Sequence, residues 1–382
     1  MALIAGNNEA FDGTCPRLGW KTWLAVAAIV AAVLAVTPWA WRKGEKAAFP
    51  ADYRQPYALS SDYWSFQRWC RDAAATRDVL VLGDSAVWGE YVGPDETLSA
   101  WMTRLDGTRR FANLGVDGVH PAAQWGLVSD FAQSVAGKDV ILYVNLLWMS
   151  TPAADLRGAP VRATVEIGWL GEVGLPYHVQ SEVRFNHPTL VPQFHPWIGC
   201  YKASLADRMT AEQERAIGFY SLLRHAKVSG LDNLGPQEWA LLHPYGNPVA
   251  ALSAGPPAAR DQAPMNPVPW AQTGAGGRDL PWMKLEDSFQ WRCLREVIGI
   301  LRSRGNRLLV VVGPFNTHML TAGSAARYAA LRGQAAEWLA ANRIPCIVPD
   351  TLPSDEYGDG SHPLSAGYRT LAQAVLRHEF FR

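Results

Sequence analysis

Short runs of consecutive apolar residues alternate with helix-like stretches in two parts of the chain. In the first part, three runs predict buried strands: residues 79–82, 110–114 and 140–144. Two stretches between them predict helices: residues 97–105 and 121–136. Pro121 suits the first turn of the second helix, where its missing N–H costs nothing. Strands that alternate with helices in this way are typical of a parallel sheet covered by helices.

The same alternation returns in the last hundred residues of the chain. Two further apolar runs, residues 308–312 and 344–348, predict the fourth and fifth strands. Apolar residues at helical spacing predict three helices: residues 294–301, 328–339 and 364–376. Residues 78–149 and 286–382 together therefore predict a three-layer α/β domain with a parallel sheet, interrupted after its third strand.

Residues 150–285 interrupt this alternation and are rich in Pro, Gly, His and Trp. Only two helices are predicted within them, at residues 211–225 and 236–242, and we interpret the segment as an inserted cap. Residues 42–77 carry no clear period and are interpreted as a polar, aromatic connector to the domain.

An apolar run from Trp23 to Trp41, interrupted only by Thr37 and Pro38, precedes the connector. The run is long enough to cross a bilayer, and Trp at both ends suits the membrane–water interfaces. A cleaved signal peptide would have a shorter apolar region that ends in a small-residue cleavage site. The run therefore predicts an uncleaved transmembrane anchor, preceded by a tail of residues 1–22.

Composition and charge exclude one class of partner and leave two questions open. The 382-residue chain has a formal net charge of +0, so it lacks the basic excess of a nucleic-acid-binding protein. Two basic residues precede the apolar run and three follow it closely, which leans weakly towards a cytoplasmic main domain. Four of the five cysteines lie beyond the run, an even number compatible with disulfides or with buried thiols.

Polar residues and glycines follow the predicted strands at the edge where the carboxyl ends meet. Ser85, Gly115 and Asn145 come at the ends of the first three strands, and Asp359 and His362 share the loop after the fifth. Ligands of open α/β sheets bind at this edge. The residue types suit acyl transfer, because His362 can take the proton of Ser85 while Asp359 orients the imidazole. Backbone N–H groups at Ser85 and Gly115 and the Asn145 amide could stabilise an oxyanion, and a side chain at Gly115 would obstruct the acyl group.

The order Gly-Asp-Ser, Gly, Asn and then Asp-x-x-His resembles that of the SGNH, or GDSL-type, hydrolases. The segments that end at Gly115 and His362 resemble the family's second and last sequence blocks closely. Asn145 lies in Tyr-Val-Asn-Leu, whereas the family commonly has Gly-x-Asn-Asp. The resemblance implies a flavodoxin-like α/β/α sandwich. It carries over five roles: Ser85 as nucleophile, His362 as base, Asp359 as its partner, and Gly115 and Asn145 as oxyanion donors. An α/β-hydrolase is the nearest rival enzyme, but its Gly-x-Ser-x-Gly motif needs glycine two residues after the serine, where this chain has valine.

Four other residues near this edge have two interpretations each. Trp88 and Trp148 could stack on sugar rings of a substrate, or pack in the core below the loops. Asn316 and His318 follow the fourth strand on the same edge. His318 could replace His362 as the base or contact substrate, and otherwise this pair only shapes the rim of the site.

The remaining histidines and cysteines predict no further chemistry. No metal or cofactor is expected, because the spacings of His178, His187 and His195 match no compact ligand motif. Cys293 and Cys346 lie on apolar elements and are interpreted as buried thiols rather than catalytic groups.

Together these features predict a single-pass, membrane-anchored serine esterase that forms an acyl-Ser85 intermediate. Its expected substrate is an O-acyl, chiefly O-acetyl, group on carbohydrate of the cell envelope, or another small acyl ester. Two alternatives stay open. One is a polysaccharide O-acetyltransferase with the same triad, supplied by a membrane acyl-transfer partner. The other is an inactive SGNH-like domain that only binds glycan or serves as a scaffold. The family resemblance favours an extracytoplasmic catalytic domain.

Overall fold

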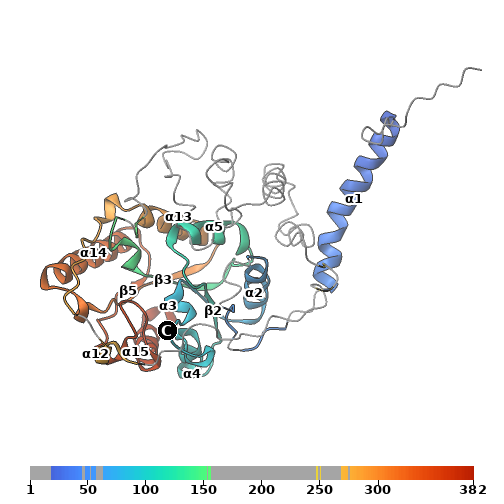
Figure 1. The fold of residues 1–382 in the computed structure, drawn as a ribbon. Helices are drawn as coiled ribbons and strands as arrows, with labels where there is room; N and C mark the ends of the chain where they lie inside the picture. Colours follow the sequence, from blue (N-terminus) through green and yellow to red (C-terminus); the bar gives the residue numbers. More distant parts are fainter. Residues whose placement is uncertain are drawn as a thin grey trace, which may run out of the picture.

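The computed structural model describes residues 19–44, 48–51, 53–56, 63–152, 154–155, 247, 250, 268–273 and 276–382. The helices with described bounds are α1 Trp20–Gly44, α2 Tyr63–Thr76, α3 Ser85–Trp88, α4 Leu98–Asp106, α5 Pro121–Phe131, α12 Trp270–Thr273, α13 Phe289–Ser303, α14 Ala322–Ala341 and α15 Ser365–Leu376 (Figure 1). The strands are β1 Val79–Gly83, β2 Phe111–Gly115, β3 Asp139–Val144, β4 Arg307–Val312 and β5 Cys346–Ile347.

The five strands form one sheet in the order β2-β1-β3-β4-β5. Each pair of neighbouring strands is parallel. The register places Gly83, the last residue of β1, beside Gly115, the last residue of β2, and Leu82 beside Leu142 of β3. The carboxyl ends of these strands therefore meet at one edge of the sheet.

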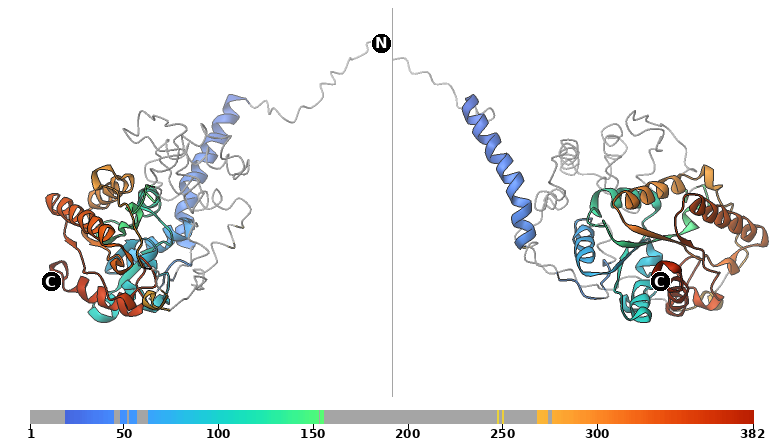
Figure 2. Two further views of the ribbon diagram at one scale, coloured as in Figure 1. Left: turned by 60° about the vertical axis from the view of Figure 1, so that its left-hand side comes forward. Right: turned by 180° about the vertical axis from the view of Figure 1, so that it is seen from behind.

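Helices cover both faces of the sheet, as Figures 1 and 2 show. Successive side chains of a strand point to opposite faces. Leu80 and Leu82 of β1 pack with apolar side chains of α2, α5, α13 and α14, whereas Val79 and Val81 pack with those of α4 and α15. Because both faces are buried, the strands are apolar throughout, which explains why uninterrupted runs mark them in the sequence. The predicted α/β architecture with a parallel sheet is confirmed.

Helix α2 departs from the prediction, which treats residues 42–77 as a connector without a periodic pattern. Its residues Phe66, Trp69, Cys70 and Ala73 lie at helical spacing, and all four are buried in the core on one face of the sheet. The Trp69 indole also donates a hydrogen bond of 2.7 Å to a backbone carbonyl of β2. Residues 63–76 are therefore part of the α/β domain.

Two predicted elements are shorter in the structure. Helix α5 ends at Phe131 rather than near residue 136. At this end of the helix, the Arg304 guanidinium donates to the backbone carbonyls of Val128 and Ala132. Strand β5, predicted over residues 344–348, pairs with β4 only through its two residues. Pro345 just before it has no N–H to donate to a sheet.

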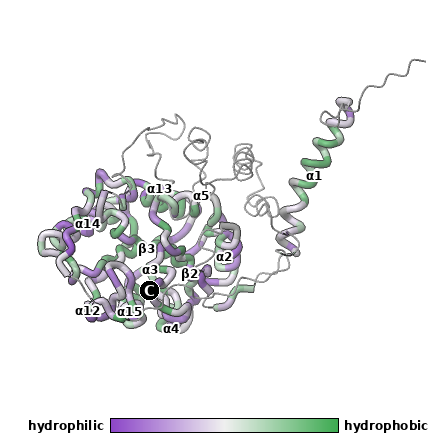
Figure 3. Tube along the Cα trace, viewed as in Figure 1, coloured by the Kyte–Doolittle hydropathy of each residue, from purple (hydrophilic) through white to green (hydrophobic). Residues whose placement is uncertain are grey.

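Helix α1 contains the predicted membrane-spanning segment. Residues Trp20–Trp41 have a mean hydropathy of 2.1, and among the described residues of this stretch only Trp41, at its end, is buried. Ile29, at its middle, is 64% exposed. Figure 3 shows the apolar colouring along the middle of α1, with paler and hydrophilic colours at its two ends. The helix is thus long and apolar enough to cross a membrane.

Most of the predicted cap lies outside the described residues. Outside them lie the helices predicted at residues 211–225 and 236–242, together with Cys200, His178, His187 and His195. The three cysteines that the structure describes beyond α1 are free thiols: Cys70 and Cys293 are buried, and Cys346 is half-buried. The buried-thiol interpretation therefore holds for Cys293, whereas Cys346 is only partly covered.

Candidate active site

The nucleophile candidate Ser85 opens a one-turn helix directly after β1. Asp84 caps this helix, because its Oδ1 accepts the backbone N–H of Ala86 at 3.0 Å. The helix ends at Gly89, whose left-handed φ of 95° favours glycine. The sequence pattern predicts no helix between the strand at residues 79–82 and the helix at residues 97–105, where a Gly/Pro-punctuated loop is expected, so α3 is a correction. Its signal is the capping aspartate just before the serine and the glycine four residues after it.

The three residues predicted as a triad lie together at the carboxyl edge of the sheet. The Ser85 hydroxyl is 2.8 Å from Nε2 of His362. Nδ1 of His362 is 2.7 Å from Oδ2 of Asp359 and 2.9 Å from its Oδ1. The Asp359 carboxylate also accepts the backbone N–H groups of Ser361 and His362, both at 2.9 Å, which fixes the loop that carries both residues. This is the geometry of a nucleophile, its base and the group that orients the base.

Charges around the triad separate the proton affinities of its members. Burial tends to raise the pKa of Asp359, but the nearby His362 charge and the hydrogen bonds to the carboxylate outweigh it and lower the pKa to about 2. Burial tends to lower the pKa of His362, but the Asp359 carboxylate raises it to about 9, with smaller contributions from Asp84 and Glu90. At pH 7, two pH units below that pKa, about 1% of the imidazole is neutral and able to accept a proton.

Tyr91 is a member of the site that the sequence does not reveal. Its hydroxyl donates to Oδ2 of Asp359 at 3.1 Å, and its ring packs edge-on against the His362 imidazole, with centroids 5.7 Å apart. Burial and the Asp359 carboxylate raise the pKa of Tyr91, so the phenol keeps the proton that it donates. Gly358 makes room for this ring, because a Cβ there would lie 2.4 Å from it.

Asp84 ties the turn after β1 to the turn after β3. Its Oδ2 accepts from the Asn145 amide at 2.8 Å and from the Trp148 indole at 2.9 Å. The Asn145 carbonyl oxygen in turn accepts the backbone N–H of Leu147 at 3.0 Å. An amide has two N–H donors, so this arrangement fixes the Asn145 side chain and leaves its second N–H outside the bond to Asp84.

The structure gives a different reason for glycine at position 115 from the one expected. A Cβ on Gly115 would lie 2.3 Å from the backbone nitrogen of Trp88 and 2.8 Å from the carbonyl carbon of Val87. The glycine therefore lets the end of β2 approach the backbone of α3. The Gly115 N–H donates to the Asn113 side chain at 3.0 Å, so it must exchange that bond before it can serve an oxyanion.

The four rim residues for which the sequence left two interpretations open lie in different environments: Trp88, Trp148, Asn316 and His318. Trp88 is 1% exposed, so the packing interpretation holds for it. Trp148 is only partly buried and stays next to Asp84 at the rim. Asn316 is fully buried and donates to the Asp359 backbone carbonyl at 3.1 Å, so it supports the triad loop. His318 lies 3.0 Å from the backbone carbonyl of Leu352, away from the Ser85 hydroxyl that His362 contacts.

Two further acidic residues, Asp117 and Glu90, lie close enough to His362 to interact with it electrostatically. Burial, followed by a hydrogen bond with Glu90, raises the pKa of Asp117 to about 8, and the His362 charge opposes this. A hydrogen bond between two carboxyl groups requires a proton on one of them. The Asp117 carboxyl therefore holds its proton more tightly than an exposed aspartate does, and no sequence motif predicts this contact.

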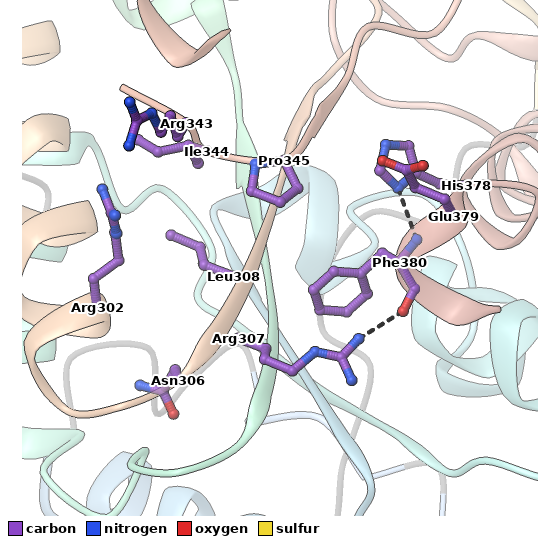
Figure 4. Close-up of a pocket in the computed structure, with 10 residues that line it drawn as sticks. All are labelled: Arg302, Asn306, Arg307, Leu308, Arg343, Ile344, Pro345, His378, Glu379 and Phe380. Atoms are coloured by element: carbon purple, nitrogen blue, oxygen red, sulfur yellow. Dashed lines mark hydrogen bonds between the residues drawn. The ribbon is translucent and has the colours of Figure 1, made fainter. Parts of the chain in front are cut away.

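A cavity of about 370 Å³ lies at the amino-terminal ends of the strands, on the side of the sheet away from the triad (Figure 4). It is lined by residues at the end of α13, at the amino-terminal ends of β4 and β5 and after α15, among them Arg302, Arg343, Leu308, Pro345 and Phe380. The triad lies at the carboxyl ends of the strands, so this cavity is not its substrate pocket.

Among the residues that the structure describes, no group of three or more His, Cys, Asp or Glu side chains could hold a metal ion. In comparisons with known proteins, no family model matches the chain and no curated protein matches it significantly.

Proposed function

We propose that this chain is a membrane-anchored serine esterase of the SGNH, or GDSL-type, class. One observation carries the proposal: the continuous hydrogen-bonded chain from the Ser85 hydroxyl through His362 to Asp359. An aspartate whose pKa is held near 2 and an imidazole whose pKa is raised to about 9 are the electrostatic partners that such a mechanism needs.

The chemistry follows from the contacts. Neutral His362 takes the Ser85 proton at Nε2, and Oγ attacks the ester carbonyl carbon. The resulting oxyanion is stabilised by the Ser85 N–H at the start of α3 and by the Asn145 amide, with Gly115 joining once its N–H leaves Asn113. Collapse of this intermediate expels the alcohol, which takes the proton from His362. Water then repeats the sequence on the acyl-serine and releases the acid.

Three features support assignment to the SGNH class. The strand order β2-β1-β3-β4-β5 is the flavodoxin-like order, and ligands of such sheets bind at the carboxyl edge, where Ser85 lies. Asp359 and His362 share one short loop, in keeping with the family's last block. Against the α/β-hydrolase alternative, the residue two beyond the serine is Val87 rather than glycine. The family's third sequence block usually has aspartate after the asparagine, whereas this chain has Leu146 after Asn145. The resemblance is therefore weaker in this block than in the others.

The proposed substrate is an O-acetyl ester on carbohydrate of the cell envelope. Helix α1 supports a location at a membrane. The resemblance to the SGNH class, rather than the helix, favours an extracytoplasmic catalytic domain. A second candidate, an O-acetyltransferase, draws on the same helix, which would keep the acyl-serine next to a membrane acyl-transfer partner. The intact triad argues against a domain that only binds glycan, because binding alone needs no base aligned on a serine.

Turnover and product partitioning test this proposal. The full-length protein in detergent is incubated with p-nitrophenyl acetate, and then with an acetyl donor and candidate oligosaccharides, with Ser85→Ala as the matched control. We expect release of acetate that is absent from the control. Acetylated sugar in excess of free acetate would instead favour the transferase, and no turnover in the wild type would contradict both enzymatic assignments.

A further inference from the structure

The chain just after α1 is docked onto the α/β domain. We call residues 48–51 and 53–56 the strap. The rings of Phe49 and Tyr53 pack against Trp69 of α2, with centroids 5.1 and 5.0 Å apart. From the other side, the Arg77 guanidinium donates to the backbone carbonyl of Pro50 at 3.0 Å. Because Gly44 ends α1 and Phe49 is already docked, at most about 18 Å of chain separates them.

Arg54 in the strap contacts helix α3, which begins with Ser85. Arg54 is 1% exposed, and its Nη1 donates to the backbone carbonyls of Trp88 at 2.9 Å and Gly89 at 2.7 Å. The guanidinium also lies 3.9 Å from the centre of the Trp88 ring. In return, the Trp88 indole donates to the backbone carbonyl of Gln55 at 2.6 Å. The strap and the end of α3 therefore hold each other through three hydrogen bonds and a cation–π contact.

Helix α3 needs such support. It has four residues, far fewer than the 12–15 or so at which an isolated helix becomes even marginally stable. The last carbonyls of a helix have no partner within it. Here the Asn113 amide satisfies that of Val87 at 2.9 Å, and Arg54 satisfies the two that follow. A cation at this end also complements the helix dipole. Ser85 is the first residue of this single turn, so what holds its last carbonyls also sets where its hydroxyl lies.

We propose that Arg54 is a positioning residue for Ser85, and that the strap which follows the membrane helix is part of the active site rather than a tether. The catalytic consequence rests on the proposed function, whereas the mechanical one does not. Without the guanidinium, the end of α3 loses two hydrogen-bond donors and a stacking partner in a buried place. The turn then shifts relative to His362, which is fixed independently by Asp359.

Two variants and a matched control test the proposal in the full-length protein. Arg54→Met removes the donors and keeps an apolar stem, Arg54→Lys keeps the charge without the planar fork, and Arg77→Met removes a different strap contact that does not touch α3. Each variant is treated with a fluorophosphonate probe well below its melting temperature. The rate of Ser85 modification is measured together with hydrogen–deuterium exchange over residues 84–92.

We expect Arg54→Met to slow the modification about a hundredfold and Arg54→Lys about tenfold, since a displacement near 1 Å costs a reaction roughly that much. Exchange should rise over residues 84–92 in Arg54→Met and stay at the wild-type level there in Arg77→Met. A purely structural role would lower the melting temperature and raise exchange throughout the domain instead.

Modification of Arg54→Met within threefold of the wild-type rate, or an equal loss in Arg77→Met, would overturn the proposal. If Arg54→Met does not fold, Arg54→Lys decides: a wild-type rate with unchanged exchange over residues 84–92 refutes it. If the wild type is not modified at all, the proposed function fails. The exchange measurement then still decides whether Arg54 holds α3.

Discussion

Raising the pH from 7 to 9 should activate Ser85 while weakening the fold. The reason is the pKa of His362, which the Asp359 carboxylate raises to about 9 against the effect of burial. The neutral imidazole that can take the serine proton makes up about 1% of the protein at pH 7 and about half at pH 9, so the rate of modification should rise about fiftyfold.

The same pKa dictates the opposite trend in stability. A group whose pKa is raised on folding stabilises the protein fully below its unfolded value, near 6.5, and the contribution is lost as the pH rises through about 9. The shift of roughly 2.5 units corresponds to about 3 kcal/mol, counted once for the Asp359–His362 pair because one attraction moves both pKa values.

The assay follows Ser85 modification by a fluorophosphonate between pH 6 and 10, with the melting temperature from tryptophan fluorescence in the same buffers. A rate that already reaches its plateau by pH 7 would refute the reasoning. It would mean that the carboxylates around His362 do not hold a proton on the resting imidazole.

Three substitutions, one of them with a control in α14, test other parts of the site. Asn145→Ala should lower kcat about a hundredfold, or about 3 kcal/mol, with little change in KM; unchanged kcat in steady-state assays would remove this residue from the oxyanion site. Gly115→Ala should destabilise the protein and slow catalysis, because the added Cβ would lie 2.3 Å from the backbone of α3. The control Gly333→Ala places its Cβ in open space on α14, so it should raise the melting temperature slightly; a similar effect of both substitutions would contradict the reasoning. Tyr91→Phe removes a donor from Asp359 and so should move the midpoint of the pH–rate profile upward, which a profile identical to wild type would contradict.

The parallel sheet could be predicted because its strands are buried on both faces. Runs such as Val79–Gly83 need no alternation to be recognised, and each ends in residues that break a strand. Once the strands are parallel, their carboxyl ends share an edge, so Ser85 and the Asp359–His362 loop could be placed together although 274 residues of sequence separate Ser85 from Asp359. Helix α2 was missed although its apolar stripe is present, because the stripe is short and begins among polar residues.

The contacts that tune the site could not be predicted. Tyr91 meets Asp359 across 268 residues, and neither belongs to a motif that names the other. Arg54 lies in a stretch without periodicity, and its partners are backbone carbonyls, which leave no trace in a sequence. The reason for Gly115 depends on how closely one strand end approaches a helix that the sequence did not reveal.

The most direct test of the central claim is peptide mapping of the fluorophosphonate adduct by mass spectrometry. The full-length wild type, Ser85→Ala and His362→Ala are treated with the probe at pH 9. We predict a phosphonyl group on Ser85 alone in the wild type, no adduct in Ser85→Ala, and modification slowed by at least about a thousandfold in His362→Ala. Folded wild-type protein that stays unmodified, or His362→Ala modified at the wild-type rate, would contradict a catalytic triad of Ser85, His362 and Asp359.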